Sequence, residues 1–232
     1  MRLPVSFACV ATLVACGTTA PPSNVLECDA ISGVVACNSF EAVDPAWTTL
    51  VDRGAVVLDD PDAADGDQAM RATVAVGGGK AALTRGIAVA DHYYARFYAN
   101  VPAGADTSGL ALLHLGETAA PFLGTNVEIA GGMLGVAVQS ADVYAYLAPM
   151  PLGRWVCLDF ELTVSDTAGH VTLYADRALV VDRDGLDTRP AAGIGDLEVG
   201  LAYVAPEATN GTTALIDDVV IAREPLAPCP TP

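Results

Sequence analysis

The sequence has few charged residues and almost no lysine. Of its 232 residues 17% are charged, and Lys80 is the single lysine among 11 basic residues. The 28 acidic residues outnumber them and set the formal net charge at −17. Such a charge repels a phosphate backbone, so a nucleic-acid partner is not expected. The hydrophobic fraction of 52% also excludes an intrinsically disordered chain, which needs low hydrophobicity.

Several motifs are missing as well. The sequence contains no GxSxG, no HExxH and no phosphate-binding loop, and its cysteines form no CxxC pair. A structural zinc site is therefore not expected. After residue 27, no apolar run is long enough to span a bilayer as a helix. The sequence has no repeat of fixed period, so a propeller is not expected.

The N-terminal residues have the pattern of an export signal. Arg2 precedes an apolar stretch over residues 5–15, which has the length of a secretory signal core. The stretch ends in the letters LVACG at residues 13–17. This ending resembles the lipobox of bacterial lipoproteins, in which a cysteine follows one large aliphatic residue and two smaller ones.

The resemblance implies a signal peptide over residues 1–15, lipid attachment to Cys16 and a short tether over residues 16–27. Several acyl chains on one residue make a durable membrane anchor. Gly17 is not an aspartate, so retention in the inner membrane is not expected and the outer membrane is the predicted location. The alternative is an ordinary secretory peptide cleaved nearby, for example after Ala20.

Four cysteines remain once the signal peptide and Cys16 are set aside. An even number in an oxidising compartment predicts disulfides, and four cysteines allow three pairings. We expect Cys28 to pair with Cys37, and Cys157 with Cys229. The first bridge would close a short loop that contains a turn, and the second would hold the C-terminal tail to a central strand.

The part of the chain after Asn38 is typical of β-strands. About thirteen short apolar runs, between residues 55 and 222, are separated by Gly, Pro, Asp and Asn. In residues 154–162 the apolar side chains fall on every second position, as in a half-buried strand. No segment has a capped helical stripe. We therefore predict one β-sandwich domain over residues 28–232 rather than two domains.

The order of the landmarks resembles the concanavalin A-like lectin/glucanase superfamily. The landmarks are residues 38–41 with Trp47, then 93–98, 154–161, 169–176 and 214–222. The resemblance covers roughly residues 38–224. It implies an all-β jelly roll of two curved antiparallel sheets, in which strands near both termini pair side by side.

The best binding candidates lie in residues 92–100. One face of this predicted strand is apolar, with Tyr93, Ala95, Phe97 and Ala99, and is expected to pack in the core. The opposite face carries aromatic rings and an arginine, which suit stacking on a sugar and hydrogen bonds to its hydroxyls. With contributions from neighbouring strands, the predicted ligand-binding set is His92, Tyr94, Arg96, Tyr98, His114, Glu128, Tyr144 and Trp155.

A structural interpretation of the same residues stays open. Tyrosines favour strands in any case, and Arg96 would then pair with Glu128 or Glu161. His114 lies between two leucines and is expected to be a partly buried histidine with a satisfied hydrogen bond rather than a catalytic base.

The resemblance also directs a search for catalytic residues. Glucanases of the superfamily carry their acid and base in an ExDxxE pattern on one strand, where alternation places the carboxylates on one face. Glu128 has no carboxylate at the next two positions of its face, and Asp159 and Glu161 lack a third. The polysaccharide-lyase branch uses Arg, Gln, His and Tyr, but its motifs are missing. The domain is therefore predicted to have no catalytic activity.

A structural calcium ion is a further implication of the resemblance. Members of the superfamily often hold one with oxygen ligands from near both termini. Asp217 is at the matching position, with backbone carbonyls near residues 40 and 41 as partners. The acidic run at 59–67 lacks the glutamate and spacing of an EF-hand and is expected to be a solvated turn.

These observations predict a monomeric, lipid-anchored protein of the bacterial outer membrane, with display at the cell surface as one arrangement. The favoured function is a non-catalytic β-sandwich that binds carbohydrate or another surface polymer. One alternative is a degenerate or divergent glycoside hydrolase or polysaccharide lyase. The other is a structural or adhesion lipoprotein that binds protein partners.

Overall fold

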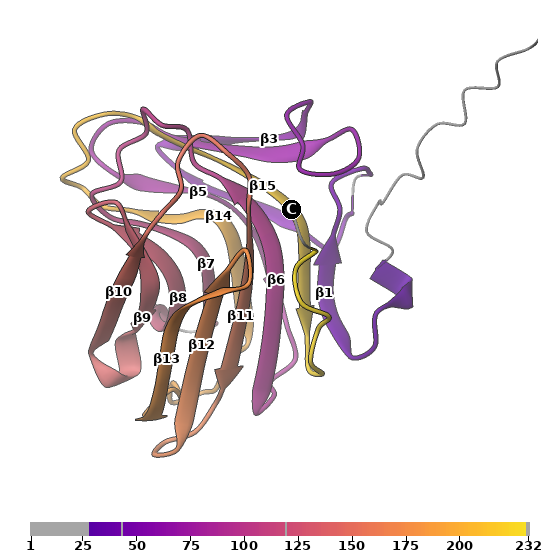
Figure 1. The fold of residues 1–232 in the computed structure, drawn as a ribbon, viewed down its shortest axis with the longest axis vertical. Helices are drawn as coiled ribbons and strands as arrows, with labels where there is room; N and C mark the ends of the chain where they lie inside the picture. Colours follow the sequence, from indigo (N-terminus) through magenta and orange to yellow (C-terminus); the bar gives the residue numbers. More distant parts are fainter. Residues whose placement is uncertain (1–27, 43, 119, 231–232) are drawn as a thin grey trace, which may run out of the picture.

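The computed structural model describes residues 28–42, 44–118 and 120–230 and shows a sandwich of two antiparallel sheets (Figure 1). The predicted all-β jelly-roll fold is confirmed. The predicted signal peptide, Cys16 and the whole tether lie outside the described residues. Within the described part, no helix combines the length and the hydrophobicity that a membrane crossing requires.

One sheet has eight strands. In spatial order it contains β13 (Ala178–Leu186), β12 (Gly169–Ala175), β11 (Val156–Thr163), β6 (His92–Asn100), β15 (Thr212–Ala222), β4 (Ala69–Val74) and β3 (Gly54–Asp60), with β1 (Val34–Asn38) also paired to β15. Because β1 and β15 are antiparallel neighbours, the two ends of the domain meet in one sheet, as the resemblance implied.

The other sheet has seven strands. In spatial order it contains β10 (Val143–Pro149), β9 (Met133–Val138), β8 (Ala120–Ala130), β7 (Leu110–Glu117), β14 (Asp196–Val204), β5 (Gly79–Gly86) and β2 (Thr48–Asp52). Two short 3-10 helices, Cys28–Ala30 and Gln139–Ala141, complete the described elements. Figure 1 shows β10, β9, β8 and β7 side by side in the layer next to β13, β12, β11 and β6.

The core lies between the sheets and follows the alternation of the strands. In β6 the side chains of Tyr93, Ala95, Phe97 and Ala99 are at most 2% exposed, which confirms the predicted inward face. Burial of such side chains is the main stabilising term, at about 25 cal/mol per Å² of apolar surface. The outer faces of both sheets are therefore left to carry polar side chains.

Two strands were not among the predicted apolar runs. The strand β2 has exposed Thr48, Thr49, Val51 and Asp52, because it is an edge strand. An edge strand tolerates polar side chains on both faces, so it lacks the period-two signal. The strand β1 has only five residues, which is short for a period-two pattern.

Both predicted disulfides are present. Cys28 is bonded to Cys37 with a Cα–Cα distance of 5.8 Å, and Cys157 to Cys229 with a distance of 6.0 Å. The second bridge joins β11 to the C-terminal tail, as expected. This disulfide therefore holds the C-terminal tail against the outer face of the eight-stranded sheet.

Candidate functional site

The structure divides the predicted ligand-binding set between the two sheets. His92, Tyr94, Arg96 and Tyr98 lie on β6, and Trp155 directly precedes β11 of the same sheet, whereas the other three lie on the seven-stranded sheet. These are His114 on β7, Glu128 on β8 and Tyr144 on β10. The expectation that neighbouring strands bring all eight together is corrected, because β6 and β7 are consecutive in the chain but belong to opposite layers.

On the eight-stranded sheet, the C-terminal tail occupies part of the predicted binding face. Arg96 donates a hydrogen bond from Nη1 to the carbonyl oxygen of Ala227 at 2.7 Å, so it does not pair with Glu128 or Glu161 as the structural interpretation expected. The backbone N–H of Cys229 donates to Asp159 Oδ2 at 3.0 Å, and Arg177 donates to the carbonyl of Cys229. Arg96 therefore helps to hold the tail in place.

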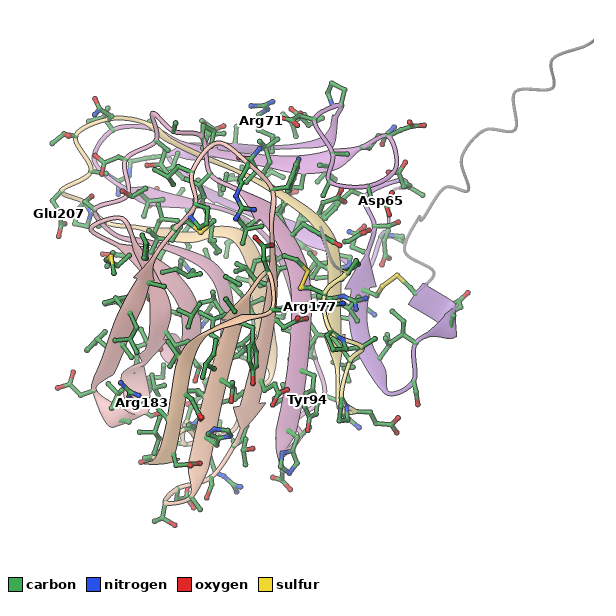
Figure 2. The ribbon with its side chains drawn as sticks, in the orientation of Figure 1. Asp65, Arg71, Tyr94, Arg177, Arg183 and Glu207 are labelled. Carbon is green, nitrogen blue, oxygen red and sulfur yellow. A yellow bond between two sulfur atoms is a disulfide. The ribbon has the colours of Figure 1, made fainter. Side chains whose placement is uncertain are left out.

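The remaining part of this face is a hollow of about 420 Å³ beside the tail. Its polar lining includes Tyr94, Asp159, Glu161, Tyr174 and Arg177, and Figure 2 shows Tyr94 and Arg177 near the layer formed by β6, β11 and β12. Burial raises the pKa of Asp159, and the N–H of Cys229 opposes that shift. This hollow is thus partly enclosed by the tail.

The other predicted residues of this sheet have separate surroundings. His92 is exposed, with Nδ1 3.3 Å from the hydroxyl oxygen of Thr163. Trp155 is half-buried, and its indole N–H has no hydrogen-bond partner among the described residues. Burial raises the pKa of Tyr98, and the nearby negative charge of Asp218 raises it further.

The seven-stranded sheet carries a second hollow of about 330 Å³ on its outer face. We call it the polar cleft. Its lining residues are Lys80, Ala111, His114, Asn126, Glu128, Gln139, Tyr144, Glu198, Ala202 and Tyr203. They come from strands β5, β7, β8, β10 and β14 and from the 3-10 helix after β9. Three of the predicted residues, His114, Glu128 and Tyr144, are therefore brought together here.

Strand register explains why these side chains meet. His114 is paired with Glu198 on one side and with Asn126 on the other, so the three form one row across the sheet. The next row places Glu128 opposite Ala111 and Gly135. Residues paired across antiparallel strands point to the same face. The small side chains in the second row leave the space that forms the cleft.

A chain of hydrogen bonds orients the carboxylate of Glu128. Asn126 Nδ2 donates to Glu128 Oε1 at 2.5 Å, and the hydroxyl of Tyr146 donates to Oε2 at 2.6 Å. His114 Nδ1 lies 2.5 Å from Asn126 Oδ1. Burial raises the pKa of Tyr146, and the hydrogen bond to Glu128 raises it further, so the phenol keeps its proton.

This network also fixes the hydrogen-bonding role of one nitrogen of His114. A carboxylate accepts only, so Asn126 must turn its NH₂ toward Glu128 and its oxygen toward the histidine. Nδ1 of His114 must then be the donor in the hydrogen bond to Asn126. His114 is 5% exposed, and its Nε2 has no hydrogen-bond partner among the described residues. The predicted partly buried histidine is present, but only one of its nitrogens is satisfied.

An ion pair closes one side of the polar cleft. Lys80 Nζ lies 2.9 and 2.8 Å from the two carboxylate oxygens of Glu198, which is 1% exposed. On the open side, Tyr144 is 56% exposed and Tyr203 is 42% exposed. The cleft thus combines exposed aromatic rings with oriented hydrogen-bonding groups.

The prediction missed several members of this cleft, namely Lys80, Asn126, Gln139, Tyr146, Glu198 and Tyr203. One signal was present in the sequence. Glu198 interrupts an apolar strand between Leu197 and Val199, which are both fully buried. A charged side chain at such a position requires a partner, but the partner, Lys80, lies 118 residues away in sequence.

Asp217, the predicted calcium ligand, is fully buried and has a different set of partners. Its Oδ2 accepts the backbone N–H groups of Ala64 and Asp65 at 2.9 and 3.2 Å, and its Oδ1 accepts that of Asp218 at 2.8 Å. These three hydrogen bonds fasten the loop before β4 to β15. The calcium ion at Asp217 stays a prediction.

The buried acidic pair predicts an unusual dependence of stability on pH. Burial raises the pKa of Asp217 to about 6, and burial together with the charge of Asp217 raises that of Asp218 to about 7. Folding thus favours the neutral forms, so stability is lost as pH rises through these values. We expect the free energy of unfolding to increase by on the order of 2 kcal/mol between about pH 8 and about pH 5.

Thermal unfolding with the variant Asp218→Asn measures this effect. Asn also tolerates the left-handed backbone at this position, where φ is 48°. The variant should melt higher than the parent at about pH 8 and should show a weaker gain on acidification. Asp184→Asn, at a highly exposed side chain, is the control. A parent protein whose melting temperature falls steadily from pH 8 to 5 would contradict the prediction.

Comparisons with known proteins identify the fold of this chain but do not assign the chain to a family. No family model matches the chain, and no curated protein matches it. Among solved structures, a sialidase superposes with a TM-score of 0.56 at 12% identity, over 82% of this chain but 18% of the sialidase. A mutant of alginate lyase Aly36B in complex with an alginate trisaccharide superposes with a TM-score of 0.54 at 11% identity, over 83% of this chain and 99% of the lyase.

These matches correct the expectation that the domain is not an enzyme. That expectation depended on missing catalytic motifs, yet alginate lyases and a sialidase share the fold at identities of 11–12%. One fold can carry different sets of catalytic residues, so the absence of these particular motifs does not exclude catalysis. The likeness itself establishes the sandwich fold, and function has to be argued from the site.

Proposed function

We propose that this protein binds a glycan chain in the polar cleft. Two exposed tyrosines, Tyr144 and Tyr203, line this cleft together with oriented polar groups around Glu128, and this combination is the main support for the proposal. A sugar ring offers an apolar C–H face for stacking and hydroxyls that require hydrogen-bond partners. The alginate trisaccharide bound to a protein of the same fold supports the choice of ligand class.

The second part of the proposal concerns location. The lipobox-like ending at residues 13–17 supports attachment of the chain through a lipid on Cys16 to a bacterial outer membrane. Two disulfides in the domain suit an oxidising compartment outside the cytoplasm. An anchored domain with a glycan cleft would hold or process a polymer of the cell envelope or of the surroundings.

Cleavage of the bound glycan is a second candidate function, favoured by the geometry of Glu128. Its carboxylate is oriented by Asn126 and Tyr146 and is only partly buried, so one side remains open to a ligand. A carboxylate held in this way can accept a proton from an attacking water, while a second water on the open side of the cleft supplies the proton that the departing sugar oxygen takes up as the glycosidic bond breaks. Release of shorter oligosaccharides by the protein, and its loss in Glu128→Gln, would support this candidate.

Removing the exposed rings tests the binding proposal. We expect Tyr144→Ala to weaken glycan binding by about tenfold, because loss of one stacking or hydrogen-bonding anchor costs about 1–2 kcal/mol. A glycan array followed by titration calorimetry with the domain over residues 28–232 measures it. Tyr94→Ala, on the opposite sheet, is the matched control.

Two results would contradict the proposal. In one, a folded, disulfide-bonded domain binds no glycan on the array, which would favour the adhesion alternative with a protein partner. In the other, binding is lost in Tyr94→Ala and retained in Tyr144→Ala, which would move the site to the hollow beside the C-terminal tail.

A further inference from the structure

The charges in the polar cleft restrict the kind of glycan it can accept. Among the described residues that line it, Lys80 is the one lysine or arginine, and it forms an ion pair with both oxygens of Glu198. Glu128 is a second carboxylate, and its hydrogen-bond partners, Asn126 and Tyr146, are neutral donors. Lys80, Glu198 and Glu128 together contribute one positive and two negative charges, which sum to a net negative charge.

An acidic sugar is poorly matched to this arrangement. Recognition of a sugar carboxylate requires a guanidinium or an ammonium group that is available to it. No arginine lines the cleft within the described residues. A uronate would instead bring its own negative charge close to Glu128 inside a domain whose chain carries a net charge of −17.

An unsatisfied atom of the cleft points to the same conclusion independently. Gln139 lines the cleft, and its buried amide oxygen Oε1 has no partner among the described residues. A buried acceptor without a partner costs about 1–3 kcal/mol. A ligand that supplies hydrogen-bond donors therefore suits the cleft.

An amino sugar meets both requirements. Its ammonium group carries a positive charge for Glu128 and three N–H donors, and its ring hydroxyls supply further donors. The exposed rings of Tyr144 and Tyr203 can pack against the sugar and interact with its cationic substituent. An N-acetylated sugar retains the shape but loses the charge and two of the three donors.

We propose that the polar cleft selects glycans that carry free amino groups, such as β-linked glucosamine oligomers, over N-acetylated and uronate glycans. This inference depends on the proposed glycan-binding function and adds the substrate class. It sets this protein apart from the alginate lyases that share its fold.

The test compares three oligosaccharides of equal length by titration calorimetry: glucosamine, N-acetylglucosamine and alginate oligomers. At about pH 6, where the sugar amine is largely charged, we expect the glucosamine oligomer to bind at least about tenfold more tightly than the N-acetylated one. We expect no measurable binding of the alginate oligomer. Glu128→Gln should remove most of the preference and leave the affinity for the N-acetylated oligomer nearly unchanged.

A matched control is essential because any acidic protein attracts a polycation. Glu161→Gln removes one negative charge from the opposite sheet, where Glu161 lines the hollow beside the tail. It should leave the preference intact. If Glu161→Gln weakens binding as much as Glu128→Gln does, the attraction is diffuse and the inference is overturned.

The remaining outcomes separate the inference from the proposed function. If the protein binds the N-acetylated or alginate oligomer as tightly as the glucosamine oligomer, and Tyr144→Ala still weakens binding, the cleft is a glycan site and the amino-sugar inference is wrong. If no oligosaccharide binds to the folded protein, the proposed function itself fails.

Discussion

Gly135→Ala is expected to lower the free energy of unfolding by about 3 kcal/mol or more and to abolish ligand binding in the polar cleft. A Cβ at this position would lie 1.9 Å from the carbonyl oxygen of Ala145 and 2.6 Å from the Cα of Tyr146. Both atoms belong to the backbone of β10, which pairs with β9 at this point. Because these are backbone atoms, rotation of a side chain cannot relieve the clash, and strands β9 and β10 must separate.

Loss of binding follows because β10 carries two residues of the site. Tyr144 lines the cleft, and Tyr146 donates the hydrogen bond that orients Glu128. Chemical denaturation measures the stability change, and a glycan titration of the folded fraction measures the binding. Gly86→Ala is the control, since a Cβ there meets no atom within 4 Å. A Gly135→Ala protein as stable as this control would contradict the predicted close approach.

Removal of the Cys157–Cys229 disulfide should destabilise the domain by about 4 kcal/mol, as the entropy of closing so long a loop in the unfolded chain indicates. The bridge spans 72 residues of sequence. It also holds the tail where Arg96, Asp159 and Arg177 bind it. Without the bridge these hydrogen bonds must hold the tail alone.

The Cys28–Cys37 disulfide provides an internal comparison. It spans only nine residues, so its loss should cost about 2–3 kcal/mol in the same entropic model. Double alanine variants of each pair, unfolded by denaturant under non-reducing conditions, give the two values. A Cys157→Ala, Cys229→Ala protein that loses less stability than the Cys28→Ala, Cys37→Ala protein would refute the predicted order.

Much of the fold could be predicted from the sequence because strand alternation is a local property. The buried residues Tyr93, Ala95, Phe97 and Ala99 are separated by outward-facing ones, and this pattern alone identifies a half-buried strand. The disulfide pairing also followed from local arguments, because one pair flanks a short turn. The edge strand β2 escaped prediction because its exposed faces impose no pattern.

The candidate site could be predicted only in part. The residue types were anticipated, since aromatic rings beside polar groups on alternating positions suit a sugar. Their grouping was not, because Tyr94 and Glu128 lie on different sheets. Gln139 was also missed, because it follows β9 in a single turn of 3-10 helix and has no pattern of its own.

By itself the sequence determined the fold class and the inward faces of its strands, and it favoured one of the three possible cysteine pairings. Only the tertiary structure decided which outward-facing side chains of different strands lie next to one another. The strand β14 inserts between β5 and β7 and thereby places Glu198 opposite His114 and within reach of the Lys80 ammonium group. The physical reason is that alternation fixes the direction of each side chain along its own strand, whereas the order of strands depends on long-range packing of the whole core.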